Sequence, residues 1–281
     1  MTTKLLTTTL LASTTLLATA QLRTPQPSPN ASVMQQVGIT DITVTYSSPG
    51  VKGRTIWGEL EPYDKFWRAG ANASTKITLT TDAKIEGKEI NAGTYAIGIM
   101  PRQNAPWTIV FAKDGSYGDW KKYDAENDVV RIEVNPIMKE NSRERLVYMF
   151  NNTTDNSTVL EMVWDKVKIP ITITVATDEL AMASIRKVIE PGATDLGRAA
   201  RYCLDNKTNL AEALTWAARA DELSERWYFS WLHAALLEAN GKYDEALVKA
   251  EEAWTLGEQN PDDFFFRDRV KKLIEDLKNR S

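Results

Sequence analysis

The hydrophobic residues of this chain change their spacing once, near residue 177, and this change limits the folds that the sequence can adopt. Before that point apolar residues alternate with polar ones, as in Ile42, Val44 and Tyr46. After it they recur three and four positions apart, as in the run from Leu210 to Ala217. Alternation is typical of strands with one buried face, and the longer spacing is typical of amphipathic helices. The sequence therefore predicts a sheet domain followed by a helical domain.

The first part contains about nine short alternating segments, separated by turn signals such as Glu86-Gly87-Lys88 and Ala92-Gly93. Nothing of helix length lies between them, whereas parallel strands would need crossover helices. The pattern therefore favours a mainly antiparallel β-sandwich of immunoglobulin or jelly-roll type, with a barrel as the related alternative. We expect this domain to cover residues 21–177.

The second part, residues 178–281, is predicted to be an all-α array of helical hairpins. The segment AEALTWAARA, from Ala211 to Ala220, corresponds to DEALVKAEEA, from Asp244 to Ala253, at a separation of 33 residues. Small residues at matching positions let paired helices approach closely, as in tetratricopeptide repeats. The sequence Asn260-Pro261 is expected to open the last helix. Two copies are fewer than such arrays usually need, so a chance similarity of Ala-rich helices is the alternative.

The first twenty residues have the order of a signal peptide. Lys4 precedes an apolar stretch from Leu5 to Leu17, and Ala18-Thr19-Ala20 has the small-x-small pattern of a cleavage site. The stretch is too short and too polar for a transmembrane anchor. We therefore expect an exported protein, periplasmic or extracellular, with the signal peptide cleaved after Ala20. An uncleaved Thr-rich N-terminus is the alternative.

Composition argues against several classes of function. A net charge of -4 gives no electrostatic footprint for nucleic acid. One cysteine, Cys203, and one histidine, His233, are too few for a Cys/His zinc site, and we expect no metal and no cofactor. A Ser-His-Asp triad would have to use His233, which lies in the helical repeat, where a packed histidine is the simpler interpretation.

A long aromatic segment interrupts the alternating pattern. It reads VKGRTIWGELEPYDKFWRAGANAS, from Val51 to Ser74, between a strand that ends near Ser47 and one that starts near Thr75. Its glycines permit turns, and Pro62 breaks any strand ladder. Excursions of about 25 residues inside a compact domain are usually functional or packed on their own side chains.

The side chains of this segment suit a ligand. Arginine offers a planar donor group for carboxylate or phosphate, and aromatic rings offer flat faces for sugars or cations. Trp120 and Tyr123, in a second polar loop, could form the opposite wall of the same cleft. The predicted ligand-binding residues are Arg54, Trp57, Tyr63, Trp67, Arg68, Asn72, Trp120 and Tyr123.

Two other interpretations of the segment compete with a binding site. In the first, the aromatic rings plug the open end of the sandwich, and the arginines pair with Glu59, Glu61 or Asp64 beside them. In the second, loop carboxylates include a glycosidase-like pair. No nucleophile elbow, phosphate-binding glycine loop or metal motif is recognisable, so we assign no catalytic residue.

Several segments of the first part carry a family resemblance. They are SPGVKGRTIWGELEPYDKFWRAGANASTKITLTTD, INAGTYAIGIMP, WTIVFAKD and YDAENDVVRIEV. Over about residues 28 to 176 the chain resembles the bacterial secreted proteins grouped as domain-of-unknown-function family 2911, and its Ala-rich tail resembles tails of some members. The resemblance implies the sheet fold and export, and it implies no activity, substrate or cofactor. At Glu59 and Asp64 the chain departs from the family, whose members often have Gly or an apolar residue there.

The sequence thus favours a non-catalytic binding module. The loop cleft would hold a small-molecule or glycan ligand, and the helical repeats would dock a protein partner. A carboxylate-based hydrolase acting on a sugar or cell-wall polymer is the rival, and a purely structural role is the third reading. Exposed aromatic faces would favour binding, and aromatic faces buried throughout would favour the structural role.

Overall fold

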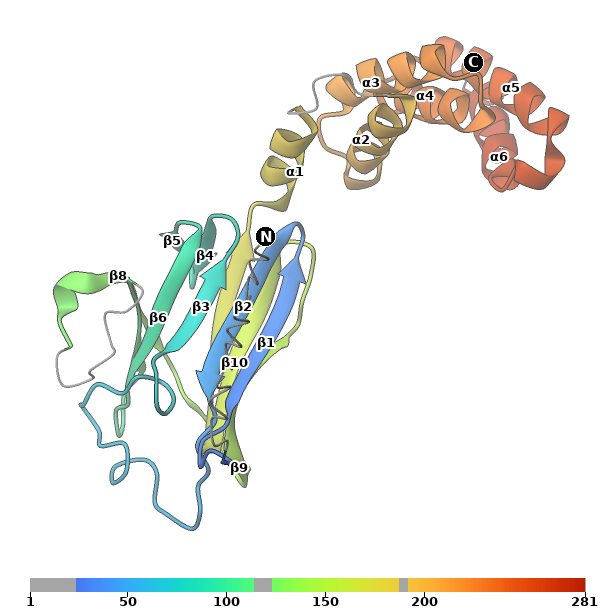
Figure 1. Cartoon of the computed structure of the whole chain (residues 1–281). Coiled ribbons are helices and arrows are strands. Elements are labelled where there is room, and N and C mark those ends of the chain that lie inside the picture. Colours follow the sequence, from blue (N-terminus) through green and yellow to red (C-terminus); the bar gives the residue numbers. More distant parts are fainter. Residues whose placement is uncertain (1–23, 114–122, 187–191, 281) are drawn as a thin grey trace, which may run out of the picture. The chain divides into compact units, whose positions relative to one another are not determined.

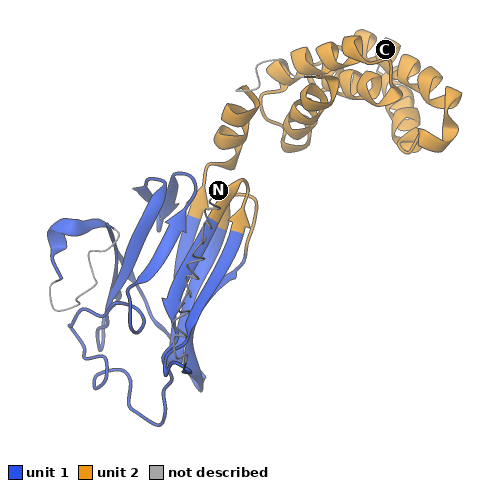
Figure 2. Cartoon of the chain, in the orientation of Figure 1, with its two compact units in different colours: residues 1–35, 42–152, 158–173 blue, residues 36–41, 153–157, 174–281 orange. Residues whose placement is uncertain are grey.

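The computed structural model describes residues 24–113, 123–186 and 192–280 (Figure 1). The chain divides into two compact units, one of residues 1–35, 42–152 and 158–173, the other of residues 36–41, 153–157 and 174–281 (Figure 2). The first unit is built of strands, and the second contains the helices. A sheet part followed by a helical part is the order that the change of hydrophobic spacing predicts, and α1 (Thr177–Arg186) begins at that change.

Ten strands of the described residues form two antiparallel sheets. The order in the larger sheet is β1 (Asn30–Val37), β2 (Thr40–Ser47), β3 (Thr75–Leu79), β6 (Gly93–Met100), β7 (Trp107–Lys113) and β8 (Asp128–Val134). The order in the smaller sheet is β5 (Lys88–Ile90), β4 (Ala83–Ile85), β10 (Ser157–Val175) and β9 (Ile137–Asn151). Tyr46 of β2 meets Tyr148 of β9 edge to face, with ring centroids 4.9 Å apart, so the two sheets share a core.

The last two strands differ from the expected series of short strands. β9 has 15 residues and β10 has 19. The polar pair Asp165-Lys166 looks like a boundary between two strands in the sequence. In the structure β10 continues through it with a shift of register against β9, and Asp165 adopts a positive φ of 49°. A local irregularity therefore absorbs the break in the pattern without ending the strand.

Five further helices of the described residues follow α1. They are α2 (Ala193–Asn206), α3 (Leu210–Leu223), α4 (Trp227–Ala239), α5 (Tyr243–Gln259) and α6 (Arg267–Lys278). Asn260-Pro261 does not open the last helix. A short 3₁₀ helix covers Pro261–Asp263, and Phe264 then packs against Gly257, where an added Cβ would lie 2.5 Å from its ring. The packing of this buried ring delays the start of α6 to Arg267.

The six alanines that define the internal repeat are all fully buried. They are Ala213, Ala217, Ala220, Ala246, Ala250 and Ala253, each 0% exposed. The first three lie on α3 and the others on α5, and both of these helices pack against α4. Small side chains at these positions allow the helix axes to approach closely.

Candidate functional site in the loop between β2 and β3

The loop from Ser48 to Ser74 contains no strand or helix of its own and turns repeatedly. Four of its non-glycine residues have positive φ angles: Lys52, Asp64, Ala69 and Asn72. Gly58 has a φ of 91°, and a Cβ built on it would lie 2.8 Å from the ring of Tyr63. Glycine is therefore required there both by the backbone and by the Tyr63 ring that packs on it.

Trp67 anchors the loop in the core between the sheets. Its side chain is 5% exposed, and its indole N–H donates to the carbonyl of Gly70 at 3.0 Å. Its backbone N–H and carbonyl both pair with Ile99 of β6 at 2.8 Å. The pairing of β3 with β6 begins at Thr75, which lies opposite Ile97. Trp67 pairs with β6 two residues further along, at Ile99.

Trp67 belongs to a cluster of four tryptophans. Trp67 stacks on Trp164 of β10 at 5.6 Å, and the half-buried Trp57 meets Trp67 at 5.6 Å and Trp107 of β7 at 4.7 Å, edge to face. The indole N–H groups of Trp57 and Trp164 are buried and have no hydrogen-bond acceptor within the described residues. Edge-to-face contacts with neighbouring rings are the weak interactions available to them. Trp67 is therefore a core residue, and the half-buried Trp57 packs against it at the edge of the core.

Phe66, next to Trp67, covers the opposite face of the same sheet. A Cβ built on Gly98 of β6 would overlap the Phe66 ring. The ring also stacks on Tyr123, with centroids 4.4 Å apart and planes within 10°. Ala96, Val110 and Ala112 complete this apolar cluster and are fully buried. Tyr123 therefore contacts the loop between β2 and β3 through Phe66.

The contact between Gly98 and Phe66 gives a first test of this arrangement. We expect Gly98→Ala to lower the free energy of unfolding by roughly 1–3 kcal/mol, because the added methyl group forces the Phe66 ring to move. The same substitution in a Phe66→Ala protein should be almost neutral. Urea denaturation of the two single variants and the double variant measures both effects. Additive losses would show that the ring does not lie on Gly98.

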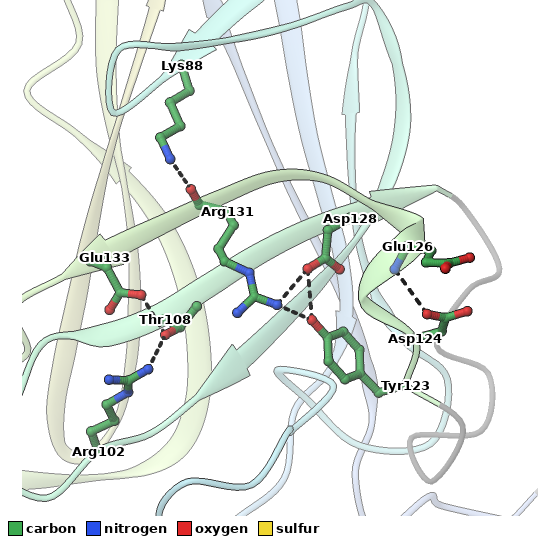
Figure 3. A network of polar contacts seen from close by, with 9 residues as sticks. All are labelled: Lys88, Arg102, Thr108, Tyr123, Asp124, Glu126, Asp128, Arg131 and Glu133. Atoms are coloured by element: carbon green, nitrogen blue, oxygen red, sulfur yellow. Dashed lines mark hydrogen bonds and ion pairs between the residues drawn. The ribbon is translucent and has the colours of Figure 1, made fainter.

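A polar network fixes Tyr123 beside β8 (Figure 3). Its hydroxyl donates to the carboxylate of Asp128 at 2.8 Å and accepts a hydrogen bond from Arg131. Arg131 also pairs with Asp128 at 2.8 Å. Burial, followed by the hydrogen bond to Asp128, raises the pKa of Tyr123 to about 12. The phenol is therefore a neutral positioning group at physiological pH.

Two of the predicted binding residues use their donors on nearby backbone carbonyls. Arg54 donates through Nε to Val51 at 3.0 Å and through Nη2 to Gly50 at 2.6 Å. Asn72 donates to the carbonyl of Ser28 at 3.1 Å. These bonds brace the turns of the loop and tie it to the chain before β1.

Glu61 is the loop carboxyl on which the charges of Arg54 and Arg68 act. Its carboxyl is half-buried, and burial raises its pKa to about 7, against the opposing effects of the Arg68 and Arg54 charges. Within residues 24–113, 123–186 and 192–280, the Arg68 guanidinium makes no hydrogen bond or ion pair. From the sequence alone, Glu61 is one of several loop acids. Its place between Leu60 and Pro62, in a run rich in aromatic residues, is the signal that could have marked it.

The predicted site residues thus have different surroundings. Trp67 lies in the core with the half-buried Trp57 against it, Tyr63 packs on Gly58, and Tyr123 reaches the loop through Phe66. The charges of Arg54 and Arg68 act on Glu61 and partly oppose the rise in its pKa that burial causes. Asn72 lies at the other end of the loop, against Ser28. Trp120 lies outside the described residues.

A second polar cluster lies in the helical unit, around the only histidine. Asp221 accepts hydrogen bonds from Ser230 Oγ at 2.6 Å and from His233 Nδ1 at 3.0 Å, and it pairs with Lys249 Nζ at 2.8 Å. Burial alone would raise the pKa of Asp221, but these bonds outweigh it and lower the pKa to about 2. Ser230 donates to the carboxylate and not to the imidazole. Ser230 and His233 therefore do not form the nucleophile and base of a catalytic triad.

In the part of the chain that the structure describes, no group of three or more His, Cys, Asp or Glu side chains could hold a metal ion. None of the helices described is both long and apolar enough to cross a membrane.

Comparison with known proteins concerns the sheet unit. No curated protein and no solved structure matches the chain. The family model described as protein of unknown function (DUF2911) matches residues 28–173, which is more than half of the 281 residues. The match spans the loop, both sheets and the residues around Glu61 and Arg68. The chain therefore belongs to the DUF2911 family.

Proposed function

We propose that the sheet unit binds a small anionic or glycan ligand without catalysis, through Arg68 and the side chains around it. One observation carries the proposal. Arg54, Trp67 and Asn72 use their donors on backbone carbonyls of the unit, whereas the Arg68 guanidinium forms no hydrogen bond or ion pair with a described group and interacts only through its charge with Glu61. A guanidinium binds carboxylate and phosphate groups through two parallel hydrogen bonds. Arg68 is therefore the binding group that the loop leaves available.

Glu61 would make this binding depend on pH. A carboxyl with a pKa of about 7 is neutral below that pH and charged above it. The charged form competes with an anionic ligand for Arg68 and repels it. The affinity for an anion should therefore fall as the pH rises through about 7.

Arg68→Ala should weaken ligand binding about tenfold or more. It should change the free energy of unfolding by less than about 1 kcal/mol, because no described partner loses a bond. Calorimetric titration against a panel of glycans and anionic metabolites, with urea denaturation in parallel, measures both quantities. Lys65→Ala removes an exposed cation from the same loop and is the matched control, which should retain affinity. A large loss of stability in Arg68→Ala would instead make Arg68 a structural partner and the loop a plug.

A carboxylate-based hydrolase acting on a sugar or cell-wall polymer is the second candidate, and the raised pKa of Glu61 favours it. An acid that titrates near pH 7 can protonate a leaving group. The same panel separates the two functions. Turnover of a glycan that Glu61→Gln abolishes would establish the hydrolase, and binding without turnover would support the binding module.

We also infer that the two facing sheets form an immunoglobulin-like or jelly-roll-like sandwich and that the helices form a tetratricopeptide-like array that docks a protein. The Tyr46–Tyr148 contact between the sheets supports the first inference, and the six buried alanines of the repeat support the second. Residues 21–177 and 178–281 would then be separate domains.

The remaining part of the proposal is export, with removal of the signal peptide after Ala20. The order of Lys4, the apolar stretch and Ala18-Thr19-Ala20 supports it. N-terminal sequencing of protein from the native cell should begin at Gln21. An intact Met1 in a cytoplasmic fraction would contradict export.

A further inference from the structure

Three helices of the second unit contribute arginine and aromatic side chains to one cluster of contacting groups. Arg201 of α2 lies 5.2 Å from the ring centroid of Trp231 on α4 and 5.7 Å from that of Phe266, just before α6. Arg269 of α6 lies 4.5 Å from the same Phe266 ring. Tyr228 of α4 contacts both Trp231 and Phe266. We call the cluster of these five residues the aromatic–arginine face; Trp231, which is 6% exposed, forms its buried base.

A pocket of about 300 Å³ continues this face at the N-terminal ends of α2 and α4. Tyr228 belongs to both, and Arg198, Arg226 and Phe265 also line the pocket. Phe265 is 68% exposed. The Phe265 ring meets Trp227 and Phe266 edge to face, and its remaining exposed part offers an apolar contact beside the pocket.

The charges around the pocket favour an anionic partner. Arg201 pairs with Asp205 at 2.7 Å, and Arg226 lies 3.4 Å from Asp263. Arg198 and Arg269 form no ion pair within the described residues. The Arg226–Asp263 pair is partly exposed, and such pairs contribute little to stability, so an incoming carboxylate can replace Asp263. The four arginines outnumber the two aspartates that pair with them, on a chain whose net charge is -4.

The pattern of charges also indicates what kind of anion fits. Asp205 and Asp263 lie beside two of the arginines and would repel a continuous phosphate backbone. Separate carboxylates on a peptide can avoid them and still reach Arg198 and Arg269. Apolar side chains between those carboxylates can fill the pocket beside Phe265.

We propose that the aromatic–arginine face and its pocket dock an extended acidic peptide segment of a partner protein, with apolar side chains between its carboxylates. The proposal rests on the protein-docking role inferred above for the helices and names the chemistry of the partner. It is independent of ligand binding at Arg68. Guanidinium groups supply the charge-assisted hydrogen bonds, and the aromatic rings supply the apolar contact.

Fluorescence anisotropy with the full chain tests the proposal. The probe is a fluorescein-labelled peptide in which Asp-Glu pairs alternate with Phe or Leu and Gly. The comparison peptides carry Lys-Lys or Asn-Gln in place of each acidic pair. The acidic peptide should bind most tightly, and its affinity should fall as salt is added. Arg198→Glu combined with Arg269→Glu should weaken binding about tenfold or more, and Phe265→Ser should weaken it several-fold.

Arg219→Glu is the matched control, because it reverses an exposed charge on α3, outside this face. It should leave the affinity unchanged, and circular dichroism should show that every variant is folded. Equal binding of the Lys-containing peptide, or an equal loss in Arg219→Glu, would overturn the acidic-peptide proposal.

If the Asn-Gln peptide binds best and loses affinity in Phe265→Ser, protein docking stands and the acidic partner is wrong. If no peptide binds, both proposals for the helices fail. Preferential binding of polygalacturonate would replace the peptide by an anionic glycan.

Discussion

Replacing Trp67 by Ala should lower the free energy of unfolding by about 3–5 kcal/mol, the usual range for removal of a buried aromatic side chain. The Trp67 side chain is 5% exposed and stacks on Trp164 with ring centroids 5.6 Å apart. Its removal leaves a cavity beside the indole rings of Trp57 and Trp164 and deletes the hydrogen bond to Gly70. Urea denaturation followed by tryptophan fluorescence and circular dichroism measures the loss.

Two controls separate this effect from a general sensitivity of the loop. Lys65→Ala changes an exposed residue two positions away and should stay within about 0.5 kcal/mol of the wild type. Trp67→Phe keeps much of the apolar contact and should lose less stability than Trp67→Ala. A Trp67→Ala protein as stable as Lys65→Ala would show that the loop is not anchored in the core.

Replacing Asp221 by Ala should have an effect of similar size in the helical unit, about 3–5 kcal/mol, because a buried ion pair loses one partner. The substitution leaves Ser230, His233 and Lys249 without the carboxylate on which they converge. These groups come from α4 and α5, so the loss should affect the packing of the array. Glu222→Ala removes a neighbouring carboxylate that is 65% exposed, and it should be nearly neutral.

The pH dependence of stability gives Asp221 a second signature. Its pKa is lowered from 3.8 to about 2 in the folded protein. A lowered folded-state pKa stabilises the protein fully above the unfolded value, and this contribution is lost as the pH falls toward 2. The difference in stability between the wild type and Asp221→Asn should therefore shrink between about pH 5 and pH 2. A difference that is constant over this range would mean that the carboxylate is not held by these donors.

Hydrophobic spacing predicted the parts of the structure that depend on one repeating pattern. The aromatic segment was expected between Ser47 and Thr75, which are the last residue of β2 and the first of β3. The matching alanines 33 residues apart are buried in α3 and α5. In both cases the spacing of the buried residues follows from the local backbone conformation, so it can be read from the sequence.

The surroundings of the site residues were less predictable, because they depend on contacts between distant segments. Arg54 and Asn72 have the chemistry of ligand-binding groups, and their use on backbone carbonyls follows from the path of the loop. The raised pKa of Glu61 follows from burial, which loop composition does not encode. The adjacent residues Phe66 and Trp67 look alike in the sequence, and only the bridge to Ile99 sends them to opposite faces of the sheet.

That bridge has a consequence for how a ligand would arrive at Arg68. Trp67 is held by two backbone hydrogen bonds to Ile99, and the carbonyl of Arg68 accepts a hydrogen bond from the backbone N–H of Thr75 at 3.4 Å. The main chain on both sides of Arg68 is therefore fixed before any encounter. A ligand would immobilise the arginine side chain alone, an entropic penalty on the order of 0.5–1.5 kcal/mol. Association would then proceed at the rate of diffusional encounter, without a slow step of loop closure.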